Sequence, residues 1–173
     1  MQLNKFLSIF FLSLFINSSS IAEIPHFLDF KYILNSSSAG KKAQDYLKNK
    51  LNNGLKNITN KEKEILDEEK KIISQKKVIS QEEYKKKVSD LRKKVLSLQK
   101  ERNTLLEDVA KKRAKAKETL LKNLNPIMKD YMSEKKIRMV VDKKSLLLAD
   151  ENLDITKDIM NLLNKKLKSI NLN

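Results

Sequence analysis

A long, charged and glycine-poor stretch from Lys41 to Lys136 constrains the fold of this chain more than any other feature. Its apolar residues are sparse and recur at helical spacing, and Gly54 is its only glycine. So thin an apolar stripe cannot enclose a globular core, and one helix of this length would have no surface on which to bury it. The stretch therefore predicts a helical arm that runs out, turns and comes back. Such a chain is expected to hold a partner rather than to catalyse a reaction.

The apolar residues of the two halves predict how the limbs pair. The outgoing half carries one apolar residue at each seven-residue step: Leu51, Ile58, Ile65, Ile72 and Ile79. The returning half carries two rows, with Tyr84, Leu91, Leu98 and Leu105 in one and Val88, Val95 and Val109 in the other. These spacings keep an apolar stripe facing a single partner helix in a supercoiled pair. We therefore expect an antiparallel coiled-coil hairpin.

Two features interrupt the helical pattern. The sequence from Ser80 to Glu83 is a capping box, in which the Ser80 hydroxyl accepts from the Glu83 amide and the Glu83 carboxylate reaches back. A helix is expected to begin there, with the hairpin tip near residues 76–81; the alternative is one continuous helix that kinks at Ser80. Pro126 lacks an amide donor and is expected to kink or break the returning limb.

The two ends of the chain predict short strands and one more helix. The run from Ile24 to Phe30 fits a strand that Pro25 confines to an edge or a strand start. Residues Ile137–Asp142 and Ser145–Ala149 predict a strand hairpin around a turn at residues 142–144. Asp154 is the expected N-cap of the last helix. Its apolar face comprises Ile155, Ile159, Leu162, Leu163, Leu167 and Ile170.

The predicted fold class is α+β and mostly α, with a long helical hairpin on a small β body formed by both chain ends. The expected divisions are residues 1–22 (signal peptide), 23–40 (N-terminal strand and start of the arm), 41–136 (arm) and 137–173 (C-terminal strands and helix). A body this small, without cysteines and with open sheet edges, is expected to need oligomerisation. The residues expected to build the oligomer are Ile24, Phe27, Leu28, Met139, Val140, Val141, Leu146, Leu147 and Leu148.

The N-terminus predicts export. Lys5 precedes a short apolar run from Phe6 to Ile16, and Ser20 and Ala22 place small residues at a cleavage site. The run is shorter than the ~20 residues of a membrane-spanning helix, so a cleaved signal peptide and a periplasmic location are expected. The alternative is an uncleaved membrane anchor.

The formal net charge of +15 favours anionic partners. Lipopolysaccharide, anionic lipid and acidic polypeptide fit this balance, whereas export argues against nucleic acid. The alternative is that the lysines only cover a solvated helix surface. The cations expected to contact a bound partner lie near the tip: Lys76, Lys77, Lys85, Lys86, Lys87, Arg92, Lys93 and Lys94. Further along the returning limb lie Lys111, Lys112 and Arg113.

The residue inventory offers no catalytic constellation. His26 is the only histidine and there is no cysteine, so a histidine-based metal site or a thiol nucleophile is not expected. The only glycines, Gly40 and Gly54, form no phosphate-binding loop. The sequence therefore predicts no enzyme, no cofactor and no metal.

Two stretches resemble the Skp (OmpH-like) family of periplasmic chaperones. The sequence from Phe30 to Gln44, FKYILNSSSAGKKAQ, is similar to the family's passage from strand to arm. The sequence Ile137–Asp142, followed by Asp154–Ile159, is similar to its C-terminal strand and final helix, and the turn at Ser80 also fits. The resemblance covers essentially the whole mature chain. Pro25 and His26 depart from the apolar, β-branched residues usual in the family's first strand.

The resemblance implies a trimer shaped like a jellyfish. Three chains would build a small β-barrel body, and three helical hairpins would enclose a cavity. It further implies an ATP-independent holdase that keeps unfolded outer-membrane proteins from aggregating before membrane insertion. The alternative is a basic coiled-coil envelope protein that binds lipopolysaccharide or anionic lipid and has a structural role.

Overall fold

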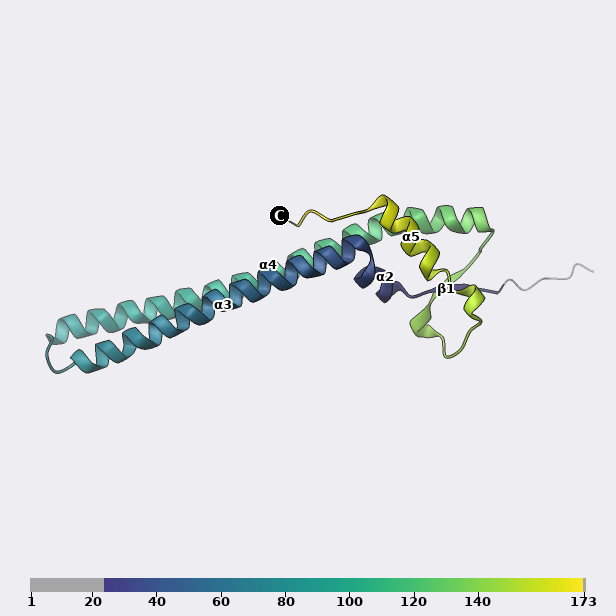
Figure 1. Ribbon diagram of the computed structural model, residues 1–173. Coiled ribbons are helices and arrows are strands. Elements are labelled where there is room, and N and C mark those ends of the chain that lie inside the picture. The colour runs from purple at the N-terminus through teal and green to yellow at the C-terminus, as the bar shows by residue number, and fades with distance from the viewer. Residues whose placement is uncertain (1–23, 173) are drawn as a thin grey trace, which may run out of the picture.

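The computed structural model describes residues 24–172, so the predicted signal peptide lies outside the described residues. Helix α3 (Ser38–Gln75) and helix α4 (Gln81–Lys135) lie side by side as an antiparallel hairpin, joined by a turn at residues 76–80 (Figure 1). The Ser80 hydroxyl accepts from the Glu83 amide at 3.1 Å and so caps α4, as predicted. The alternative of one continuous helix is therefore wrong.

The seam between the limbs is narrow. Among the predicted row residues, those that become buried are Ile58, Ile72, Leu98 and Val109. Val95 belongs to the same rows but stays 48% exposed. Helix α4 extends past α3 into the body, where Leu124 and Ile127 are buried on either side of Pro126. The helix continues through Pro126 to Lys135, so a break there is wrong; burial of these neighbours offsets the one lost hydrogen bond.

The elbow between body and arm consists of two capped helices in sequence. The N-terminal strand is shorter than expected, because helix α2 (Phe30–Ser36) begins directly after it. The Asp29 carboxylate caps α2 by accepting from the Tyr32 amide at 2.7 Å. Ser37, which is fully buried, then caps α3 by accepting from the Gly40 amide at 3.2 Å. Each cap satisfies an unpaired helix-end donor, so the chain turns sharply without leaving buried polar groups unpaired.

A two-stranded parallel sheet joins the chain ends. Strand β1 (His26–Leu28) pairs with β2 (Val140–Asp142), with Phe27 opposite Val141. On its other side Phe27 bridges to Asp154, and its carbonyl accepts from the Ile155 amide at 2.9 Å. The mostly helical fold with a small sheet agrees with the predicted class.

The strand predicted at Ser145–Ala149 is wrong. Residues Lys143–Ser145 form the short 3-10 helix η1, and a second one, η2, spans Glu151–Leu153. Strand β2 and Asp154 pair with opposite sides of β1, so the segment between them crosses over instead of returning along β2. At its start, the Lys143 Nζ lies 2.9 Å from the Asp154 carboxylate and 5.6 Å from the centre of the Phe27 ring. The crossing segment is a loop that ends at Asp154, beside β1. Burial raises the pKa of Asp154, but hydrogen bonds from Thr156 and Lys143 outweigh this and hold it below its usual value.

Helix α5 (Thr156–Lys166) packs on α4 and completes the core of the body. Its Ile159 and Leu163 are fully buried, whereas Leu162, which was predicted on the same face, is 37% exposed. Asp154 accepts from the Thr156 amide at 2.9 Å, but it stands one residue before the position that caps the helix. Across residues 24–172, no helix combines the length and the hydropathy that crossing a membrane requires.

Candidate binding surfaces on the arm

The two sides of the hairpin seam differ in chemistry. On one side, ion pairs join the limbs across a hollow of about 560 Å³ that is lined mostly by polar and charged residues. Their Nζ-to-oxygen distances are 3.0 Å for Lys50–Asp108, 2.7 Å for Lys61–Glu101 and 2.7 Å for Lys94–Glu68. These pairs are partly solvated, so each contributes little to stability. They do, however, cover this side of the seam with charge.

The other side is an open apolar groove, here called the distal groove. Its outer part has a volume of about 540 Å³ and its inner part about 330 Å³. The two parts share Ile65 and Val95. The remaining apolar lining residues are Ile58, Leu66, Ile72, Ile73, Tyr84, Val88, Leu91, Leu96 and Leu98.

Several side chains of the distal groove face water. Leu66, Ile73 and Leu96 are 54%, 60% and 70% exposed. Among the described residues, only Arg102–Glu62, at 3.4 Å, forms an ion pair across this side. A run of exposed apolar side chains with few charges marks a surface that another apolar chain can cover.

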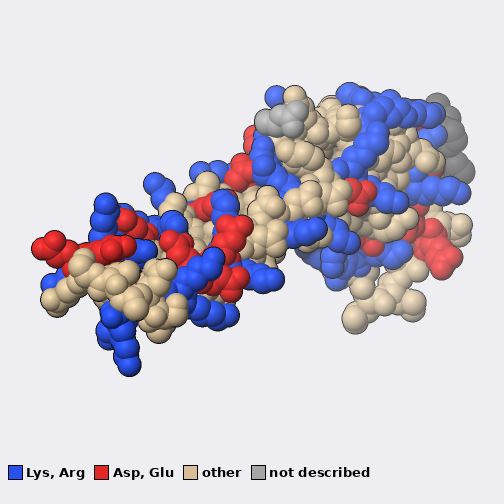
Figure 2. All heavy atoms as spheres, turned by 60° about the vertical axis from the view of Figure 1, so that its left-hand side comes forward, with Lys and Arg blue, Asp and Glu red and all other residues tan. Residues whose placement is uncertain are grey.

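The tip cations predicted to contact a partner differ in how free they are. Lys87, Lys93 and Lys94 lie within ion-pair distance of Glu83, Asp90 and Glu68, and Lys76 lies over the Tyr84 ring at 5.8 Å. Arg92 lines the distal groove. In the part of the chain that the structure describes, Lys77, Lys85 and Lys86 have no ion pair. Figure 2 shows blue and red side chains interspersed over the arm, so the positive field there is a net excess rather than a continuous patch.

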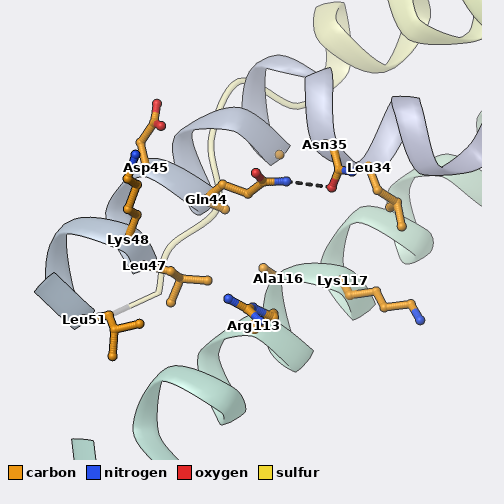
Figure 3. A pocket seen from close by; sticks show the side chains of 12 residues that line it. Leu34, Asn35, Gln44, Asp45, Leu47, Lys48, Leu51, Arg113, Ala116 and Lys117 are labelled. Atoms are coloured by element: carbon orange, nitrogen blue, oxygen red, sulfur yellow. Dashed lines mark hydrogen bonds between the residues drawn. The ribbon is translucent and has the colours of Figure 1, made fainter. Parts of the chain in front are cut away.

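The arm root contains a pocket that no motif in the sequence predicted. It has a volume of about 650 Å³ and lies between the elbow and α4. Its walls include Leu34, Leu47 and Ala116, and Arg113 and Lys117 contribute cationic side chains from α4 (Figure 3). No periodic signal could have revealed the pocket, because the elbow that forms its upper wall is set by the two caps.

A second surface at the root is already occupied. The chain beyond α5, residues 167–172, has no regular secondary structure and runs back along the hairpin (Figure 1). Leu172 is 4% exposed and packs with Ala43, Leu47, Val109 and Ala116. The Leu172 carbonyl accepts from Lys112 Nζ. The predicted helix face included Leu167 and Ile170, but both follow the end of α5 and so belong to this tail.

The single histidine has a structural position. The His26 amide donates to the Met139 carbonyl at 3.1 Å, and its Nδ1 is buried without a hydrogen-bond partner among the described residues. Over residues 24–172, no three His, Cys, Asp or Glu side chains gather as metal ligands would.

Comparisons with known proteins agree with this architecture. The family model described as outer membrane protein (OmpH-like) matches residues 26–163. The structure is similar to that of a candidate outer membrane chaperone (OmpH-like) from Caulobacter crescentus CB15, with a TM-score of 0.79. Sequence identity is 19%, and the alignment covers 91% of this chain and 95% of that chain. No curated protein matches the sequence.

Proposed function

The chain belongs to the OmpH-like outer membrane protein family, and we propose that it is a periplasmic, ATP-independent holdase for unfolded outer-membrane proteins. The observation that carries this proposal is the asymmetry of the arm. One side of its seam is covered by ion pairs, while the other leaves Leu66, Ile73 and Leu96 exposed along the distal groove. Such a surface suits a partner that presents apolar side chains and has no fixed shape.

The chemistry of unfolded barrel proteins fits the distal groove. Their strands alternate apolar and polar residues, so in water each segment has one apolar side to cover. A shallow apolar surface covers that side without demanding one sequence. The excess of lysine near the tip adds attraction over a longer range, which salt weakens. Because each contact is weak, a client is held and still released without ATP.

We further propose that three chains join through their bodies. Strand β2 has one hydrogen-bonded neighbour among the described residues, so its other edge is free to pair. Of the residues predicted to build the oligomer, Phe27 and Leu28 lie in the core of the single chain. Ile24, Met139, Leu147 and Leu148 are instead 60% exposed or more, and Leu147 and Leu148 are almost entirely so. A trimeric barrel would cover these side chains and direct three arms around one cavity.

The proposal is tested by suppression of aggregation. An outer-membrane β-barrel protein is diluted from urea, and its light scattering is followed with and without the mature protein, residues 23–173. We expect the wild type to suppress scattering and a Leu66→Ser, Ile73→Ser, Leu96→Ser variant to lose most of that effect. All three side chains are exposed, so the fold should survive. Leu106→Ser with Leu162→Ser is the control, to be compared with each pair of groove substitutions, since both leucines are exposed outside the distal groove.

Two further measurements separate the parts of the proposal. The solution mass at low micromolar concentration should be that of a trimer, and a stable monomer would contradict the shared body. Binding to vesicles of anionic lipid, or to lipopolysaccharide, without suppression of client aggregation would instead support the structural envelope role. Wild-type protein that leaves client scattering unchanged would contradict the holdase function.

A further inference from the structure

The C-terminal tail occupies a groove at the arm root, here called the root groove, whose apolar lining is Ala43, Leu47, Val109 and Ala116. Leu172 is the tail residue that fills it, and Ile170 is partly buried against the same cluster. Lys168, Ser169 and Asn171 are exposed. From residue 169 the tail therefore alternates exposed and covered side chains, which is the pattern of a strand with one apolar side.

We propose that the root groove is a binding site for extended polypeptide with alternating apolar residues, and that the tail is its built-in competitor. This inference rests on the proposed holdase function for the identity of the natural partner. The tail shows how such a polypeptide would bind. It has no regular secondary structure, its apolar side chains Ile170 and Leu172 are two residues apart, and Lys112 donates to its backbone. A contact with a main-chain carbonyl is available in every polypeptide, so it favours no particular sequence.

The position of Lys112 supports a role in holding a chain. Its side chain is 17% exposed, and its Nζ lies 3.9 Å from the Asp108 carboxylate while it donates to the Leu172 carbonyl. If the tail left, this ammonium group would lose its contact with the Leu172 carbonyl, and the apolar residues beside it would lose their cover at the same time. A segment of client that matched the tail would restore both contacts.

The root groove and the neighbouring pocket form adjoining surfaces. The pocket is lined by Ala43, Leu47 and Ala116, which also contact the tail, but by no residue of the tail itself. In Figure 3 the thin trace of the tail passes close to Gln44 and Leu47, which both line the pocket. If the tail left, Ala43, Leu47 and Ala116 would be exposed toward the root groove as well as toward the pocket.

The test frees or fixes the tail and measures peptide binding. The probe is a fluorescent ten-residue peptide that alternates leucine with serine or threonine. In Ile170→Ser, Leu172→Ser protein the tail should no longer compete, and we expect the peptide to bind at least about threefold more tightly than to wild type. Leu162→Ser is the control, because it removes one apolar side chain of the same size from α5, outside the root groove.

A second variant guards against loss of fold. The chain has no cysteine, so Val109→Cys with Leu172→Cys, in two members of the same buried cluster, allows a single disulfide within a chain. Loss of free thiol on oxidation shows that this bond has formed and holds the tail in place. Peptide binding should be weak when this protein is oxidised and should return on reduction. The inference would be overturned if the Ile170→Ser, Leu172→Ser variant bound the peptide no more tightly than wild type. It would also be overturned if the oxidised and reduced forms of the cysteine variant bound the peptide equally well.

The two proposals fail separately. If the wild type suppresses client aggregation and neither tail variant changes peptide affinity, the holdase function stands and tail competition falls. If freeing the tail strengthens peptide binding but no form of the protein suppresses client aggregation, the root groove stands as a peptide site and the holdase function falls.

Discussion

Gly54 on the outgoing limb lies directly against the side chain of Leu105 on the returning limb. A Cβ atom at residue 54 would stand 2.5 Å from Leu105 Cδ2 and 2.7 Å from Leu105 Cδ1. The glycine therefore makes room for a leucine that is itself one of the predicted row residues. Since glycine is unfavourable within a helix, the limb gives up intrinsic helix stability to seat Leu105.

A double-mutant cycle tests this relationship. Gly54→Ala should lower the free energy of unfolding by about 1 kcal/mol, because Leu105 must shift away. In a Leu105→Ala background the same change should stabilise the protein by roughly 0.5–1 kcal/mol, since only the gain in helix propensity remains. Chemical denaturation of the four proteins provides the measurement. Additive effects would show that the two residues do not restrict each other.

The other glycine faces backbone rather than a flexible side chain. A Cβ atom at Gly40 would lie 2.0 Å from the Leu34 carbonyl oxygen, across the elbow between α2 and α3. Relief requires the helices to separate, so Gly40→Ala should cost more than Gly54→Ala, on the order of 2–3 kcal/mol. Thermal unfolding of Gly40→Ala that matched wild type would contradict this close approach.

The parts of the structure that sequence predicted correctly rest on local signals. Ser80 caps α4 through a hydrogen bond three residues along the chain, and Ile58 and Ile72 recur at an interval that a helix pair enforces. The failure at Ser145–Ala149 has the opposite origin. Its leucines have the composition of a strand, but the segment has to cross from β2 to the other side of β1, where Asp154 bridges to Phe27.

The surfaces on the arm were only partly predictable. Heptad rows identify a seam, and the seam residue Val95 does line the distal groove. They do not say which side is covered by charge, because that depends on how the lysines of one limb meet the glutamates of the other. Leu172 gave even less signal, since a short tail carries no period and gains its burial from residues 56 or more positions earlier in the chain.

The unpaired tip lysines should account for much of the salt dependence of client binding. Replacing Lys77, Lys85 and Lys86 by glutamine removes three charges that no ion pair holds, so the fold should be unchanged. We expect client affinity at low salt to fall roughly 3- to 10-fold, as for three weak exposed contacts, and the loss to shrink as salt rises. Replacing Lys129, Lys157 and Lys165, which are exposed on the body side, changes the net charge equally and serves as the control. Equal effects of the two triple variants would assign the dependence to total charge instead of to the tip.

The contact between Tyr131 and Asp158 should make the body sensitive to alkali. The Tyr131 hydroxyl donates to the Asp158 carboxylate at 2.6 Å, and burial together with this hydrogen bond raises the pKa of Tyr131 to about 12 from 10.0. Below pH 10 the phenol is protonated in both folded and unfolded chains, and its stabilising contribution is complete. Between pH 10 and 12 the unfolded chain loses this proton first, so the free energy of unfolding falls as pH rises. Lysines also titrate in this range, so the measurement is the difference between wild type and Tyr131→Phe, with Tyr32→Phe as a control for loss of an exposed hydroxyl. We expect the advantage of wild type over Tyr131→Phe to shrink from pH 9 to pH 12, and a constant difference would contradict the prediction.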